Sequence, residues 1–171
     1  MSNDYTESSA SPAYLSELHT LIRSSDVILL ETSAVLHPGF EAMLSDLILV
    51  LSQCKKHLTL LPNTISCLMQ FASCPEESPN LQALRILDVL WILRDHNILH
   101  VHGHTGQPIH CDGEALHWIL EQLRDQSVLL LTQSPGLAAD CASLSSLHTR
   151  GITVRRIAGP HGRLDAFACT G

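Results

Sequence analysis

The sequence predicts an α/β fold: a three-layer α/β/α sandwich around a mainly parallel, five-stranded sheet. Short apolar runs of strand length alternate along the chain with longer stretches that carry apolar residues at helical spacing. The first run, Asp26–Glu31, is apolar throughout its interior, as is typical of a strand buried on both faces of a parallel sheet. A chain of 171 residues, 45% hydrophobic and 16% charged, is suited to one core of this kind.

The predicted elements follow one another in a regular order. Strands alternating with helices favour right-handed crossovers and a parallel sheet covered on both faces. We expect strands at residues 26–31, 57–61, 98–101, 128–132 and 152–157, with a short edge at 164–167 as a further candidate. We expect helices at residues 40–54, 63–72, 81–95, 112–124 and 135–147.

The ends of the chain and its apolar runs bear on domain organisation and location. Met1–Pro12 is polar, acidic and rich in serine, so we expect a flexible tail followed by one domain over residues 13–171. The tail lacks the basic start and apolar stretch of a signal peptide. The longest apolar run, Met43–Leu51, is too short to span a bilayer. A cytoplasmic protein without membrane contact is therefore expected, with its six cysteines reduced.

The charge balance limits how the chain could hold nucleic acid. The net charge is −7 and Lys and Arg number only 10, which excludes a broad basic surface for phosphates. The one local basic stretch is Arg150–Arg163. Contact with nucleic acid is therefore expected to be local or assisted by a metal ion.

In parallel α/β sheets, ligands bind beyond the carboxyl ends of the strands, near the point where the strand order reverses. The residues in this position are 31–36, 62–67, 102–114 and 132–137. Two of these segments carry a family resemblance. Val27–Leu36 resembles the opening strand of PIN domains, where a carboxylate and then Thr or Ser stand at the strand end. Val128–Ala138 resembles the fourth strand and following helix of that family, and the similarity covers about residues 26–167.

The resemblance implies a PIN-like fold and a divalent-cation site for hydrolysis of single-stranded RNA. Hard Mg²⁺ or Mn²⁺ prefers oxygen ligands and would activate water at the phosphate. Of the four acidic positions of the family, the first falls on Glu31 and the third on Asp112, with Glu114 close by. The second and fourth fall on Cys67 and Ser134, which carry no carboxylate.

The resemblance therefore predicts a degenerate site. Glu31 and Asp112 are the candidate catalytic residues, and with Glu114 they are the candidate Mg²⁺ or Mn²⁺ ligands. Ser33, Thr132 and Ser134 are candidates for contacting a phosphate. We expect an RNA-associated or regulatory binding protein, a pseudoenzyme with weak or absent ribonuclease activity. An active Mg²⁺- or Mn²⁺-dependent ribonuclease remains an alternative.

The same residues also have purely structural interpretations. Asp112 and Ser134 can each cap the helix that follows, because their side-chain oxygens can accept from free amides of the first turn. Glu31 at the end of a buried strand needs partners, since burying an unpaired charge is costly.

Two further functions stay open. The histidine-rich segment before residue 112 could bind zinc, and its candidate ligands are His100, His102, His104 and His110. The low charge and apolar composition also fit a homodimer or another protein partner, with Leu81–Leu93 as one surface.

Overall fold

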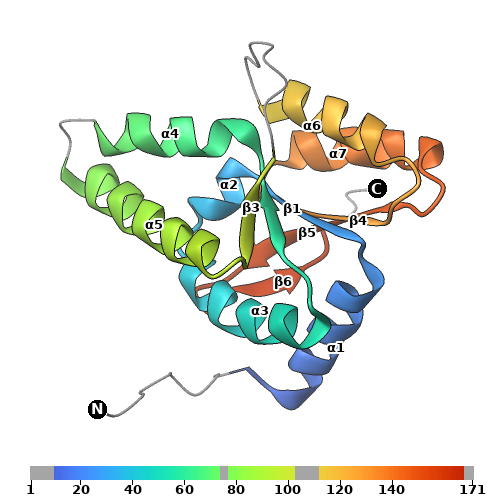
Figure 1. Ribbon diagram of the computed structural model, residues 1–171, viewed down its shortest axis with the longest axis horizontal. Helices are drawn as coiled ribbons and strands as arrows, with labels where there is room; N and C mark the ends of the chain where they lie inside the picture. Colours follow the sequence, from blue (N-terminus) through green and yellow to red (C-terminus); the bar gives the residue numbers. More distant parts are fainter. Residues whose placement is uncertain (1–9, 74–76, 103–111, 168–171) are drawn as a thin grey trace.

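A computed structural model describes residues 10–73, 77–102 and 112–167 and shows an α/β fold (Figure 1). Its six-stranded sheet has the order β3-β2-β1-β4-β5-β6. The strands are β1 Val27–Leu30, β2 Leu58–Leu60, β3 Leu99–Val101, β4 Val128–Leu131, β5 Ile152–Ala158 and β6 Arg163–Asp165.

The first five strands are parallel, as predicted, and β1 lies in the middle between β2 and β4. The pairing puts Leu30 of β1 beside Leu60 on one side and Leu131 on the other. The expected number of strands was wrong by one. After β5 the chain turns back through Gly159 and Gly162, both with positive φ, and β6 pairs with β5 in the antiparallel direction.

Seven α-helices and one 3₁₀ turn lie in the described residues. The helices are α1 Pro12–Ser24, α2 Thr32–Val35, α3 Phe40–Cys54, α4 Pro62–Ala72, α5 Glu77–Asp95, α6 Asp112–Gln122 and α7 Pro135–Leu144, and the turn η1 is Ser145–Leu147. Helices α1 and α2 were not predicted from the sequence. Helix α1 begins at Pro12, the last residue of the predicted tail, where the Ser11 hydroxyl accepts from the amide of Tyr14 at 3.3 Å.

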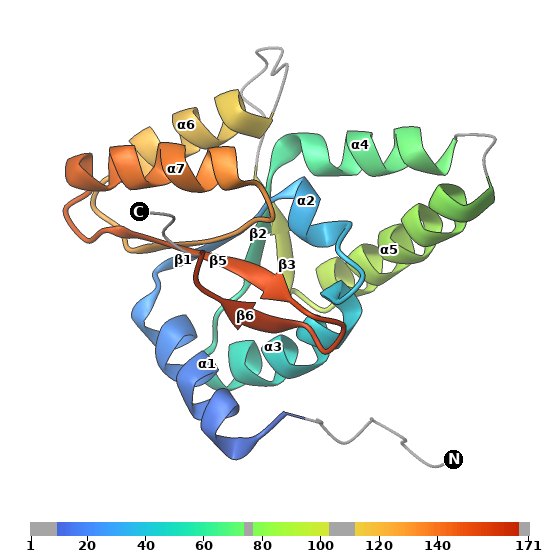
Figure 2. The same cartoon turned by 180° about the vertical axis from the view of Figure 1, so that it is seen from behind.

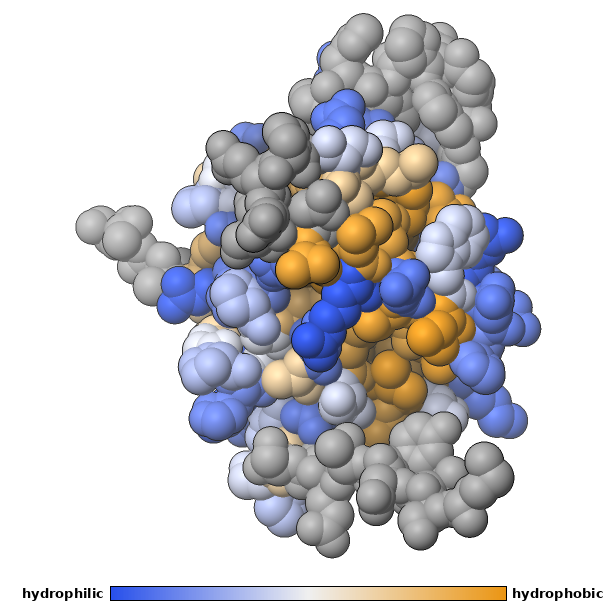
Figure 3. Space-filling view, turned by 90° about the vertical axis from the view of Figure 1, so that its left-hand side faces the viewer, coloured by the Kyte–Doolittle hydropathy of each residue, from blue (hydrophilic) through white to orange (hydrophobic). Residues whose placement is uncertain are grey.

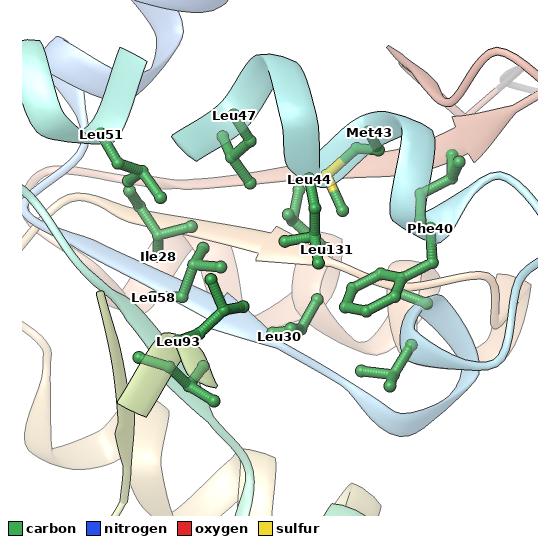
Figure 4. Close-up of a cluster of buried hydrophobic side chains, with 14 of the residues drawn as sticks. Ile28, Leu30, Phe40, Met43, Leu44, Leu47, Leu51, Leu58, Leu93 and Leu131 are labelled. Atoms are coloured by element: carbon green, nitrogen blue, oxygen red, sulfur yellow. The ribbon is translucent and has the colours of Figure 1, made fainter. Parts of the chain in front are cut away.

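The core lies on both faces of the sheet because side chains alternate along each strand. Ile28 and Leu30 belong to the cluster covered by α1, α3 and α5, whereas Leu29 belongs to the cluster covered by α6 and α7. Figure 4 shows the larger cluster, in which Phe40, Met43, Leu44, Leu47 and Leu51 of α3 point toward side chains of β1, β2 and β4.

Helices α4 and α5 form an arm beside the β3 edge of the sheet. Figures 1 and 2 both show the two helices side by side and directed away from the sheet. Only the inner face of α5 enters the core, through Ala83, Ile86, Leu90 and Leu93.

Within the parts of the chain that the structure describes, no helix combines the length and apolar character that crossing a membrane requires.

Candidate functional site

Glu31 lies directly after β1, at the carboxyl edge of the sheet, and is the N-cap of α2. The residue is 5% exposed. Oε1 of its carboxylate accepts a hydrogen bond from the Ser33 amide at 3.0 Å. Oε2 accepts from the Ser33 hydroxyl and, at 2.7 Å, from the Thr132 hydroxyl. Three donors therefore hold the carboxylate, which compensates for its removal from water.

Thr132 comes from the neighbouring strand, because β1 and β4 are paired and end together. The register places Leu30 beside Leu131, and the Glu31 amide donates to the Leu131 carbonyl at 3.1 Å. We call Glu31, Ser33 and Thr132 the Glu31 cluster. It joins the ends of the two central strands through side chains as well as through the backbone.

The hydroxyl protons of the cluster are fully used. A serine or threonine hydroxyl has one proton to donate, and those of Ser33 and Thr132 both point to Glu31. Their oxygens also accept: Ser33 from the amide of Gln133 at 2.8 Å, and Thr132 from the amide of Ser134 at 3.0 Å. The cluster therefore orders the turn from β4 into α7.

This geometry leaves Glu31 little capacity for a metal ion. Carboxylate oxygens offer about four lone-pair directions in all, and three donors occupy the region around Glu31. A divalent cation there would have to displace the hydroxyls or approach Oε1 alone. Thr132 is 0% exposed, so a phosphate reaches its hydroxyl only if the cluster opens.

The remaining acidic candidates lie on α6, whose first residue is Asp112. The side chain of Asp112 lies outside the described part of the structure. Glu114 is exposed on the first turn of the same helix. Among the described side chains, no three His, Cys, Asp or Glu residues are grouped closely enough to hold a metal ion.

Cys67 and Ser134, where the sequence resemblance implies carboxylates, have ordinary structural surroundings. Cys67 is a half-buried thiol on α4. The Ser134 hydroxyl caps α7 by accepting from the Leu137 amide at 3.3 Å, as its place before Pro135 predicted. Neither side chain supplies a hard oxygen anion for Mg²⁺ or Mn²⁺.

The zinc candidates divide between described and undescribed residues. His100 of β3 stacks on His57, with ring centroids 4.0 Å apart. Burial, then the charges of His100 and Lys56, lower the pKa of His57. His102 meets the edge of Trp118 on α6 at 5.7 Å. His104 and His110 lie outside the described residues.

A second contact at the same edge was not predicted from the sequence. The hydroxyls of Thr32 and Thr64 lie 2.9 Å apart, both buried, and join α2 to the start of α4. The contact could have been predicted, because Thr32 follows β1, Thr64 follows β2, and these two strands are neighbours in the sheet. Gln133 was also missed: its side-chain amide donates to the Ile157 carbonyl at 3.1 Å and so ties the α7 turn to β5.

Comparison of the chain with protein-family models, with curated proteins and with solved structures finds no match.

Proposed function

We propose that this chain is a degenerate PIN-like domain that acts by binding, in association with single-stranded RNA, and that its ribonuclease activity is weak or absent. The observation that carries the proposal is the state of Glu31. Its carboxylate is the first acid of the family pattern, and here it is bonded to Ser33 and Thr132 at the junction of β1 and β4.

The loss of catalysis follows from charge and ligand number. Metal-assisted phosphate hydrolysis needs several anionic oxygens to hold the cation and offset its charge. Cys67 and Ser134 remove two of the four carboxylates that the resemblance implies. Glu31 retains a carboxylate group, but this group already accepts hydrogen bonds from hydroxyl and amide donors.

The proposed RNA contact rests on the resemblance and on position. The two segments that resemble PIN domains, after β1 and after β4, are neighbours in the sheet. They meet where the strand order reverses, the usual place for ligands in parallel α/β sheets. Ser33, Gln133 and Ser134 are each half-buried there, so part of each residue faces solvent. With a net charge of −7, such binding should be weak and sensitive to salt.

The test measures cleavage and binding of labelled single-stranded RNA with Mn²⁺ by wild type, Glu31→Gln and Asp112→Asn. Asp140→Asn, an exposed acid on α7, is the control. We expect no cleavage by wild type above the level of the two variants, and RNA binding that Asp112→Asn and the control retain. Cleavage that both variants lose and Asp140→Asn keeps would overturn the loss of catalysis. Absence of RNA binding by folded wild type would overturn the RNA assignment.

Residual nuclease activity is the second candidate, and one detail favours it. Oε1 of Glu31 accepts one hydrogen bond among the described residues, from Ser33, so a lone pair can still face a cation. If Glu31, Asp112 and Glu114 hold an ion, titration calorimetry with Mn²⁺ should show one site per chain that Asp112→Asn weakens. No heat of binding at millimolar Mn²⁺ would exclude this function.

A further inference from the structure

The outer face of α5 carries large apolar side chains that are exposed to solvent. Leu81 is 70% exposed and Ile92 57%, and Leu84 and Trp91 beside them are about half exposed at 47% and 49%. Figure 3 shows the side of the molecule on which α4 and α5 lie, where hydrophobic residues gather into a surface interrupted by a few hydrophilic ones. An apolar surface of this kind is typical of an interface.

Two apolar and two charged residues of this face lie along one side of the helix. They are Leu81, Arg85, Asp88 and Ile92, which follow one another at spacings of four, three and four residues. At 3.6 residues per turn, these spacings place all four on one stripe about 60° wide. We call them the α5 stripe. From its N-terminal to its C-terminal end, the stripe contains an apolar, a basic, an acidic and an apolar residue. In the opposite direction the order is apolar, acidic, basic, apolar, so each charged position then has the opposite sign.

A sequence of this type is complementary to a second copy of itself. When two α5 helices pair antiparallel, with the two-fold axis between Ile86 and Leu87, Leu81 faces Ile92 of the other copy. In the same register Arg85 faces Asp88 of the other copy, and symmetry repeats both contacts. A single register of the two helices therefore brings the apolar residues at the ends of the stripe into contact and also pairs the opposite charges at its centre.

The monomer leaves these charges available for such a contact. Asp88 is exposed and forms no ion pair among the described residues. Arg85 contacts Glu41 at 2.6 Å, but its side chain is 72% exposed and its guanidinium has five donors. It can therefore bind a second carboxylate while keeping the first.

From this self-complementary stripe we propose that the chain forms a two-fold homodimer through α5. The occupant of the exposed face is a second copy of this chain. The interface goes beyond the RNA-associated function, because the α5 stripe lies on the arm and not in the Glu31 cluster. The contact is small, so the expected dissociation constant is on the order of 10 µM.

The test uses two charge variants and sedimentation equilibrium of the full chain. In Arg85→Asp the pairing brings Asp against Asp, and in Asp88→Arg it brings Arg against Arg. Each variant alone should be monomeric where wild type dimerises. Mixed together they should form a heterodimer, because one chain then presents two acids to the two bases of the other.

Leu81→Lys should also abolish dimerisation, and Leu147→Lys is its matched control. Leu147 is 59% exposed but lies in η1, outside the stripe. Thermal unfolding of every variant checks that the monomer stays folded. Wild type that remains monomeric at about 100 µM, tenfold above the expected constant, would overturn the proposal and leave the face to a different partner. Failure of the folded charge variants to form a heterodimer would overturn it equally, as would loss of dimers in Leu147→Lys.

Discussion

The hydroxyl of Thr132 donates a 2.7 Å hydrogen bond to Oε2 of Glu31 between the ends of the two central strands. Both residues are buried, and the Thr132 oxygen accepts from the Ser134 amide on its other side. The threonine therefore links the carboxylate to the start of α7. A hydrogen bond to a buried carboxylate contributes more to stability than one between neutral groups.

Thr132→Val should lower the free energy of unfolding by about 2 kcal/mol, because it leaves a buried carboxylate and the Ser134 amide each one partner short. Urea unfolding of wild type and variant measures the difference. Thr149→Val is the control, since the Thr149 hydroxyl bonds the Arg124 carbonyl at 3.0 Å on an exposed surface. The control should lose less than about 1 kcal/mol. Equal losses of unfolding free energy in the two variants would show that the hydrogen bond to Glu31 contributes no more to stability than an exposed one.

The Thr32 and Thr64 hydroxyls give a second prediction of different form. Thr32→Val or Thr64→Val alone should cost about 1–2 kcal/mol, because each leaves the other hydroxyl buried without its partner. The double variant should lie closer to wild type than the sum of the two losses, since both polar groups are then gone. A double-mutant cycle from urea unfolding measures this coupling. Strict additivity would mean that the two hydroxyls do not depend on each other.

The central strands β1 and β4 were predictable because their apolar runs are buried on both faces. β1 and β4 lie within one residue of the expected bounds at each end. Helix α2 was not predicted, since it has four residues and its start depends on the Glu31 cap. Helix α1 was missed although Tyr14, Leu18 and Ile22 stand at helical spacing and are buried in the structure.

The position of Glu31 at the carboxyl edge of the sheet was predictable, but the hydrogen bonding of its carboxylate was not. Glu31 follows a buried apolar run, which predicts a position at the carboxyl edge of the sheet. The parallel pairing of β1 and β4 places it beside Thr132. Whether that carboxylate faces a cation or accepts hydrogen bonds depends on side-chain rotamers of Ser33 and Thr132. Residue types and spacing do not contain that information, because the same hydroxyls could have faced solvent or a phosphate.

Gly162 gives a prediction about the turn between β5 and β6. Its φ is +70°, and a Cβ there would clash with the backbone of Met43 and Gly39 at the start of α3. Gly162→Ala should therefore destabilise the fold by more than about 3 kcal/mol, since backbone strain and a steric clash both oppose it. Gly151→Ala is the matched control: φ is +81°, but a Cβ meets nothing within 4 Å.

The control isolates the backbone cost, which should be about 1–2 kcal/mol. Chemical denaturation of both variants measures the two losses. Similar values for both would mean that the turn moves away from α3 and that its close approach is not needed.

The stacked rings of His57 and His100 predict a dependence of stability on pH. The pKa of His57 is lowered, first by burial and then by the nearby charges of His100 and Lys56. The unfolded chain therefore binds a proton more readily than the folded one. The resulting stability is complete above the unfolded pKa of about 6.5 and is lost as pH falls from there through the lower folded pKa.

His57→Phe removes the titrating group and keeps an aromatic ring to stack on His100. Its unfolding free energy should therefore fall less than that of wild type between about pH 7 and pH 5. Burial also lowers the pKa of His37, whose Nδ1 accepts from the Gly39 amide at 3.0 Å, so part of the dependence should remain. His96→Phe, at an exposed position just after α5, serves as the control. Urea unfolding at several pH values across this range measures the free energy of unfolding of each variant. If its pH dependence in His57→Phe is the same as in wild type, the pH dependence comes from other groups.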